Sequence, residues 1–69
     1  PPSPLDIDIT RYLRNVSGIA SEEEVHRQTS HGKAGRTPAM TRIALHKLVA
    51  AGVVDKVNGQ YRLARGARS

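Results

Sequence analysis

Hydrophobic residues recur with a helical period near the start of the chain. One apolar face is formed by Ile9, Tyr12, Leu13 and Val16, spaced i, i+3, i+4 and i+7. We predict a helix from Asp6 or Asp8 to Val16, because both aspartates suit the cap and the dipole at a helix amino end. Ser17-Gly18 is predicted to end this helix.

The run Ser-Glu-Glu-Glu at 21–24 marks a second helix. A serine followed three residues later by a glutamate is a capping box, and acids in the first turn suit the helix dipole. We predict a short helix that ends at Thr29 or Ser30, with Val25 as its only clear core residue. The acidic run is therefore interpreted as a helix start and not as a metal or catalytic site.

A third helix is predicted over about 37–51, with Thr37 as N-cap, Pro38 in the first turn and Gly52 as its stop. Its inner face is predicted to comprise Met40, Ala44, Leu45, Leu48, Val49 and Ala51. The opposite face is predicted to carry Arg42 and His46, with Ala39, Ile43 and Ala50 beside them and Lys47 nearer the margin.

The last segment, V-V-D-K-V-N-G-Q-Y-R-L-A at 53–64, predicts a β-hairpin, since Asn58-Gly59 lies between two β-prone runs. A two-residue turn pairs position 57 with 60, 56 with 61, 55 with 62 and 54 with 63. Asp55 then faces Arg62 on the outer side of the hairpin. The inner side is predicted to hold Val54 and Leu63, with Tyr61 and Lys56 nearer the tip.

Composition narrows the function classes. The chain has 69 residues, enough for one small domain, and no cysteine, which excludes disulfides and cysteine zinc sites. Its three histidines show no ligand pattern, so we expect neither a metal nor another cofactor. No apolar run is long enough to cross a membrane, and no signal peptide is evident. We expect an intracellular protein, in the cytoplasm, nucleoid or nucleus.

Residues 1–5, which begin Pro-Pro-Ser-Pro, are predicted to be a linker, 6–64 the folded domain and 65–69 a basic tail. The chain begins with proline and not methionine, so we expect it to be part of a longer protein. The remaining domains or subunits of that parent are then further candidate partners.

Charge is distributed unevenly along the chain, whose formal net charge is +5. Residues 1–30 hold three basic and five acidic residues, a balance of −2. Residues 31–69 hold eight basic residues against Asp55 alone, a balance of +7. This asymmetry favours a polyanion, and nucleic acid above all, as the partner.

The basic stretch S-H-G-K-A-G-R-T-P at 30–38 does not match a nucleotide-binding P-loop. A serine stands where that pattern needs its first glycine, an arginine replaces its lysine, and no apolar strand precedes it. We interpret 31–36 instead as a basic loop before the third helix, in which Lys33 and Arg36 supply charge and two glycines allow close approach.

The order helix, short strand, helix, helix, hairpin resembles the winged-helix-turn-helix family. The stretch L-H-K-L-V-A-A-G-V-V at 45–54 looks like the end of that family's recognition helix entering its first wing strand. The resemblance covers about residues 6–64 and implies an α+β, mainly α fold, with three helices and a C-terminal two-stranded β-hairpin wing. The link of six or seven residues before the third helix is longer than the family's turn. Three alternatives stay open: the link tilts the third helix, forms an ordered basic loop, or is only a floppy solvated loop.

The resemblance implies a double-stranded DNA-binding domain. We expect no enzyme activity, because no nucleophile is paired with a base and the acids at 22–24 are interpreted as a helix cap. The third helix would enter the major groove, while the 31–36 loop and the 55–62 wing would contact the phosphate backbone. Arg42 is the candidate for a guanine contact. Thr37 contacts a phosphate or only caps the helix, and Ile43 meets a thymine methyl, a core edge or a protein partner. The full set of candidates is Lys33, Arg36, Thr37, Ala39, Arg42, Ile43, His46, Lys47, Lys56, Gln60 and Arg62.

Two other functions stay open at this stage. A protein-interaction module in a replication or regulatory assembly would use Ile43 as an anchor, since fold does not decide function. The hypothesis of RNA or single-strand binding has less support. Those modes of binding use aromatic side chains as stacking platforms, and the only aromatic residues of the chain are Tyr12 and Tyr61. The parent protein is expected to be a transcription regulator, a DNA replication or partition protein, or an ATPase with an accessory winged helix.

Overall fold

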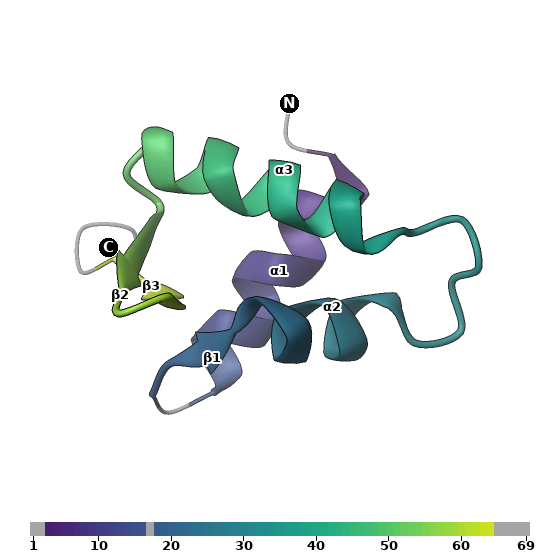
Figure 1. Cartoon of the computed structure of the whole chain (residues 1–69), viewed down its shortest axis with the longest axis horizontal. Coiled ribbons are helices and arrows are strands. Elements are labelled where there is room, and N and C mark those ends of the chain that lie inside the picture. The colour runs from purple at the N-terminus through teal and green to yellow at the C-terminus, as the bar shows by residue number, and fades with distance from the viewer. Residues whose placement is uncertain (1–2, 17, 65–69) are drawn as a thin grey trace.

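The computed structural model describes residues 3–16 and 18–64. In chain order, these residues form α1 (Pro4–Asn15), β1 (Ala20–Ser21), α2 (Glu22–Ser30), α3 (Pro38–Ala50), β2 (Val54–Val57) and β3 (Gln60–Leu63). The helices pack together, and the strands lie at one end of the helical layer (Figure 1). The predicted class, α+β and mainly helical, is confirmed.

α1 begins earlier than predicted. The Ser3 hydroxyl accepts the backbone N–H of Asp6 at 3.2 Å, and the Asp6 carboxylate accepts the backbone N–H of Ser3 at 3.4 Å, which is a complete capping box. Pro4 fits directly after this cap, because the first helical position needs no N–H. A start at Asp6 or Asp8 is therefore wrong, and so is the linker for residues 3–5. Residues 1 and 2 lie outside the described residues.

The hairpin has the predicted register. Position 54 pairs with 63, 55 with 62, 56 with 61 and 57 with 60. The turn uses positive φ at both of its central residues, 51° at Asn58 and 78° at Gly59, which is why an Asn-Gly pair stands there.

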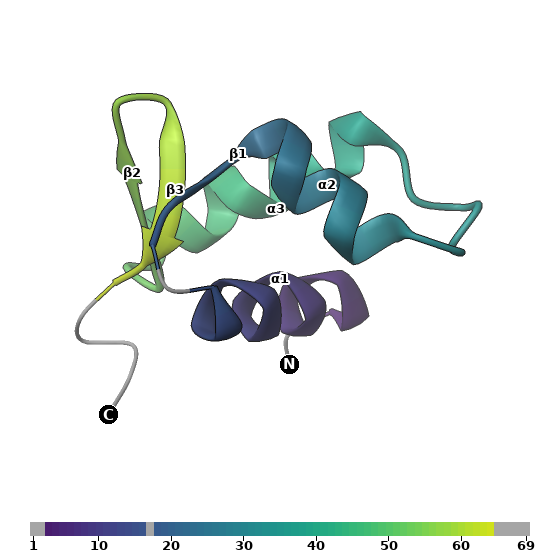
Figure 2. The same ribbon diagram turned by 90° about the horizontal axis from the view of Figure 1, so that it is seen from below.

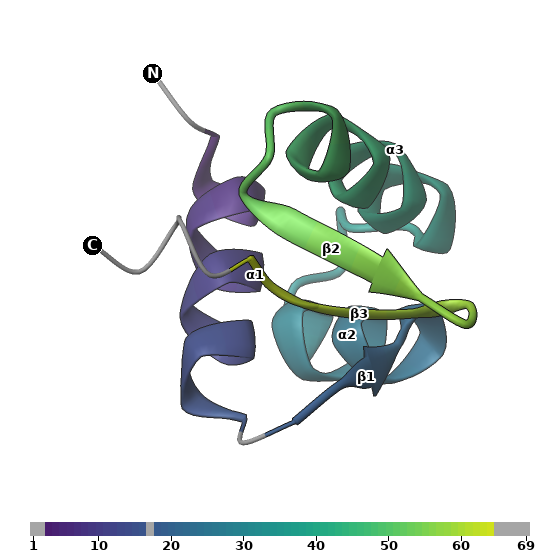
Figure 3. The same ribbon diagram turned by 90° about the vertical axis from the view of Figure 1, so that its left-hand side faces the viewer.

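The sheet has a third strand, so the predicted two-stranded wing is incomplete. β1 pairs antiparallel with β3, Ala20 with Tyr61 and Ser21 with Gln60, which gives the strand order β1-β3-β2 (Figure 3). A strand of two residues is too short to show any period in the sequence, and only its partner makes it a strand.

The core lies between the helices and the inner side of the sheet. It comprises Leu5, Ile9, Leu13, Ala20, Val25, Ala44, Leu45, Leu48, Val54 and Tyr61. In α3 the buried stripe is rotated relative to the prediction: Met40 is 43% exposed and Ala51 is exposed, whereas Thr41 is fully buried. The helix can bury Thr41 because α2 offers a polar partner for its hydroxyl, described below.

Two substitutions in α3 test this burial pattern. Leu45 is fully buried and Ile43 is 56% exposed. We expect Leu45→Ala to lower the free energy of unfolding by about 2–5 kcal/mol, because it leaves a cavity in the core. Ile43→Ala is the matched control on the same helix, with an expected change within about 0.5 kcal/mol. Urea unfolding measures both, and equal losses would contradict the orientation of α3.

Candidate nucleic-acid interface

α3 lies on the outside of the molecule, with α1 and α2 on its inner side (Figure 1). Thr37 is its N-cap, and its hydroxyl accepts the backbone N–H of Met40 at 3.2 Å, so Thr37 has the capping role. The exposed residues of the helix after Pro38 are Ala39, Met40, Arg42, Ile43, His46, Lys47 and Ala50. All five candidates within the helix therefore face solvent, and Met40 joins them.

Arg42 has an acidic partner that the sequence did not indicate. Its Nε donates to Oε2 of Glu22, the first residue of α2, at 3.1 Å. The side chains of Arg42 and Glu22 are 56% and 33% exposed. The candidate base contact is thus an arginine already oriented by a carboxylate, at the surface where α2 begins beside α3.

Arg36, which the sequence predicts to contact a phosphate, has two partners within the domain. Its Nη1 donates to Oδ2 of Asp8 at 2.7 Å and to the backbone carbonyl of Thr29 at 2.5 Å, and its side chain is only 13% exposed. These bonds connect the loop to α1 and to the end of α2. Arg36 thus anchors the loop with its charge used inside the molecule, and its contact with a phosphate stays a prediction.

The Arg36 anchor alters the titration of its partner. The hydrogen bond from Arg36 holds the pKa of Asp8 below its ordinary value of 3.8, with further help from the charges of Arg36, Lys33 and Arg11. The ionised form of Asp8 is thus favoured in the folded protein.

The loop between α2 and α3 presents Lys33 to solvent. Its backbone is closed by two bonds: the N–H of Lys33 donates to the carbonyl of Ser30, and the N–H of Arg36 donates to the carbonyl of Lys33. Gly32 has φ of 73°, a conformation that favours glycine. A side chain at Gly35 would meet open space, so no crowding by the rest of the domain explains that glycine.

A polar contact joins α2 to α3 on the inner side of α3, beneath its exposed face. Nδ1 of His26 lies 2.8 Å from the hydroxyl of the buried Thr41 and 3.2 Å from that of Ser30. This contact satisfies a hydroxyl that would otherwise be costly to bury. The sequence alone assigns His26 no partner, because nothing in it pairs positions 26 and 41.

The hairpin extends beyond the helices, and its tip points away from α1, on the side where α2 and α3 lie (Figure 2). Lys56 is exposed, with its ammonium 5.8 Å from the centre of the Tyr61 ring. Nε of Arg62 lies 3.8 Å from Oδ2 of Asp55, the predicted cross-strand pair. Gln60 is half-buried. The basic tail predicted at 65–69 lies outside the described residues.

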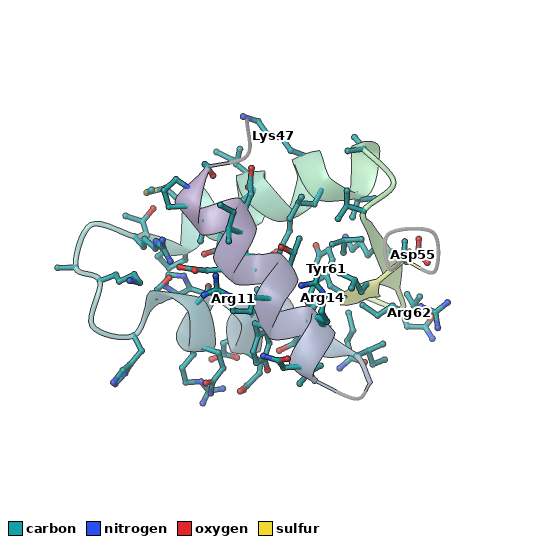
Figure 4. The ribbon with its side chains drawn as sticks, turned by 180° about the vertical axis from the view of Figure 1, so that it is seen from behind. Arg11, Arg14, Lys47, Asp55, Tyr61 and Arg62 are labelled. Atoms are coloured by element: carbon teal, nitrogen blue, oxygen red, sulfur yellow. The ribbon has the colours of Figure 1, made fainter. Side chains whose placement is uncertain are left out.

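In residues 3–16 and 18–64, the basic side chains come from several separate elements. Lys47 points outward from α3, whereas Arg11 and Arg14 lie on α1, and Arg62 lies beside Asp55 on the hairpin (Figure 4). Arg14 and Arg62 line one groove of about 420 Å³ between the end of α1 and β3. The sequence does not show that Arg14 and Arg62 line the same groove, because this depends on how β3 packs against α1.

An apolar groove runs between the start of α1 and the exposed face of α3, with a volume of about 610 Å³. It is lined by Ser3, Pro4, Leu5, Asp6, Arg36, Met40, Ile43, Ala44 and Lys47. Met40 and Ile43 are two of the exposed large hydrophobic residues of the domain. The α3 surface is therefore apolar on the flank toward α1 and charged on the flank toward α2.

Compared with protein-family models, curated proteins and solved structures, the chain shows no match. No helix in residues 3–16 and 18–64 is long and apolar enough to cross a membrane. The same residues contain no group of three histidine, aspartate or glutamate side chains placed to hold a metal ion. The function therefore has to be argued from the surface itself.

The Asp8–Arg36 contact predicts a pH-dependent stability. Because the pKa of Asp8 is lowered on folding, the ionised carboxylate stabilises the fold above its ordinary pKa of 3.8, and this contribution is lost as pH falls through the lowered value. We expect Asp8→Asn to reduce the urea midpoint at pH 7, and the difference from wild type to shrink as the pH falls below 3.8 and through the lowered pKa of Asp8.

Glu23→Gln is the control for this experiment, since Glu23 is exposed and has no ion pair among the described residues. Its midpoint at pH 7 is expected to stay closer to that of the wild type, because this variant loses only the interaction of one charge with the helix dipole. The role given to Asp8 would be contradicted if the urea midpoints of Asp8→Asn and wild type differed by the same amount at all pH values down to about 2 to 3. That range lies well below the ordinary pKa of a carboxylate.

Proposed function

We propose that this chain is a double-stranded DNA-binding domain in which α3 enters the major groove and the hairpin contacts the phosphate backbone. The observation that carries the proposal is the position of α3. Its exposed face is covered by no other described element, and the hairpin tip projects on the side of α2 and α3 (Figures 1 and 2). A helix of this diameter fits the major groove, and a flanking hairpin reaches the backbone.

The order of elements supports the same proposal. Helix, short strand, two helices and a hairpin follow one another as the winged-helix resemblance implies. Within the family-like arrangement, α2 and α3 form the helix-turn-helix pair, and the hairpin is the wing. The longer link between α2 and α3 is held in place by Arg36, so it can present Lys33 at a fixed position.

Charge also supports a polyanionic partner. The net charge is +5, and the exposed lysines at 33, 47 and 56 take part in no ion pair among the described residues. These three come from the loop, from α3 and from the hairpin, the elements proposed to contact DNA. The lysines would contact phosphates and set the register, and Arg42 would contact a base edge.

A single lysine tests the proposal. We expect Lys33→Ala to weaken binding to all duplex sequences alike and to reduce the slope of log affinity against log salt by about 1, because one phosphate contact is lost. Fluorescence anisotropy with labelled duplexes, between about 50 and 200 mM salt, measures both quantities.

The matched control is Arg27→Ala, which removes the same charge from outside the loop, α3 and the hairpin. Arg27 is exposed and paired with Glu24 on α2. We expect this variant to keep the wild-type salt slope. Equal effects of the two substitutions would mean that only total charge matters, and no binding by wild type at low salt would refute the proposal.

The apolar groove favours a second candidate, a protein-interaction module. Met40 and Ile43 leave an apolar surface beside the start of α1, with Lys47 at its rim. An amphipathic helix with an acidic polar face has the chemistry to fill such a groove.

Titration with a synthetic acidic amphipathic peptide distinguishes the second candidate from the first. If it is correct, amide NMR shifts appear at Leu5, Met40 and Ile43, and Ile43→Ser abolishes them. If the domain binds DNA alone, the peptide produces no shifts, and duplex DNA produces them at the loop, α3 and hairpin.

A further inference from the structure

The ion pair between Glu22 and Arg42 involves a particular atom of the arginine. Nε of Arg42 is the donor, at 3.1 Å from Oε2 of Glu22. A guanidinium carries five N–H donors in a rigid plane. Glu22 therefore engages the side edge of this plane, while the two terminal nitrogens remain at the end of a side chain that is 56% exposed.

Glu22 is itself held from two directions. It is the first residue of α2, directly after the N-cap Ser21, whose hydroxyl accepts the backbone N–H of Glu24 at 3.1 Å. Ser21 also belongs to β1 and pairs with Gln60 of β3. The backbone that carries Glu22 is thus fixed by a helix and by the sheet, so its carboxylate is a defined support for Arg42.

A supported arginine suits one base edge. Guanine presents O6 and N7 side by side in the major groove, and two N–H donors of one arginine can bond both. Fixing Nε removes rotamer freedom that the arginine would otherwise lose on binding. The carboxylate also disfavours use of Arg42 as a general phosphate contact, because the acid would approach the same phosphate.

We propose that Glu22 is a positioning residue that makes Arg42 selective for guanine. This inference rests on the proposed DNA-binding function and adds how that surface chooses a sequence. Glu22 does not contact the base. It orients the arginine, whose terminal nitrogens read the guanine edge, and it lowers affinity for sequences in which the arginine finds no base partner.

The test begins with the 69-residue chain and a duplex pool randomised over about 12 base pairs, slightly more than one helical turn. Selection with wild type yields a preferred site. Affinities are then measured for that site and for versions with each G·C pair replaced by A·T. Arg42→Ala identifies the pair that Arg42 reads, as the one position where the preference is lost, by about 5-fold or more.

Glu22→Ala is expected to reduce the preference for guanine at that same pair, by a factor of about 3 or more, and to leave other positions unchanged. Glu22→Gln keeps an oxygen that accepts from Nε, so it should restore most of the preference without restoring the charge. Glu23→Ala is the control, because it removes one acid from the same helical turn without touching Arg42.

The outcomes separate the two proposals. No binding of any duplex by wild type refutes the DNA-binding function and this inference with it. Binding in which Glu22→Ala keeps the full preference for guanine, or in which Glu23→Ala loses it equally, overturns the role of Glu22 alone. So does a result in which Arg42→Ala reduces the preference at no base pair of the site. Urea unfolding of each variant shows that the fold persists, since a purely structural ion pair would change the midpoint but not the preference.

Discussion

The pairing of β1 with β3 is the contact on which the other features depend. β3 is the middle strand of the sheet, and its Tyr61 is 1% exposed, at the centre of the core. Ser21 ends β1 and also caps α2, so the sheet holds in place the helix start that the Ser21 cap specifies locally. The sheet thereby sets the position of Glu22 beside α3, and the geometry of the outer surface follows from it.

Polar contacts supplement a small apolar core. A domain of this length buries only about 60% of its unfolded surface, so apolar packing alone holds its elements weakly. His26 meets the hydroxyl of Thr41 between α2 and α3, and Arg36 connects the loop to Asp8 on α1. Each contact joins elements that are distant in the sequence, and each orients a part of the surface: the face that α3 exposes and the loop that presents Lys33.

Folding reduces the charge asymmetry seen in the sequence. Two arginines of the basic half pair with acids of the acidic half, Arg36 with Asp8 and Arg42 with Glu22. The lysines that stay outside ion pairs are few and are spread over separate elements. Since affinity for DNA depends on how many phosphates are neutralised, one such domain is expected to bind weakly.

Local signals in the sequence determined much of the fold. The Asn-Gly turn specified the hairpin and its register, Ser21 with its acids specified the start of α2, and Thr37-Pro38 specified the start of α3. Each signal acts within a few residues, where backbone geometry and capping decide the outcome. The same local chemistry starts α1 at Pro4, although the prolines were interpreted as a linker.

Only the tertiary structure decided which charges remain at the surface and which face α3 exposes. Glu22 lies 20 positions before Arg42, and Asp8 lies 28 before Arg36. No periodicity records such pairs, because they exist only once the helices have packed. The orientation of α3, which buries Thr41 and exposes Met40, likewise exists only in the packed structure, where His26 of another helix is the partner of the Thr41 hydroxyl. The sequence determined the elements through contacts between near neighbours, and packing between distant segments determined the surface they present.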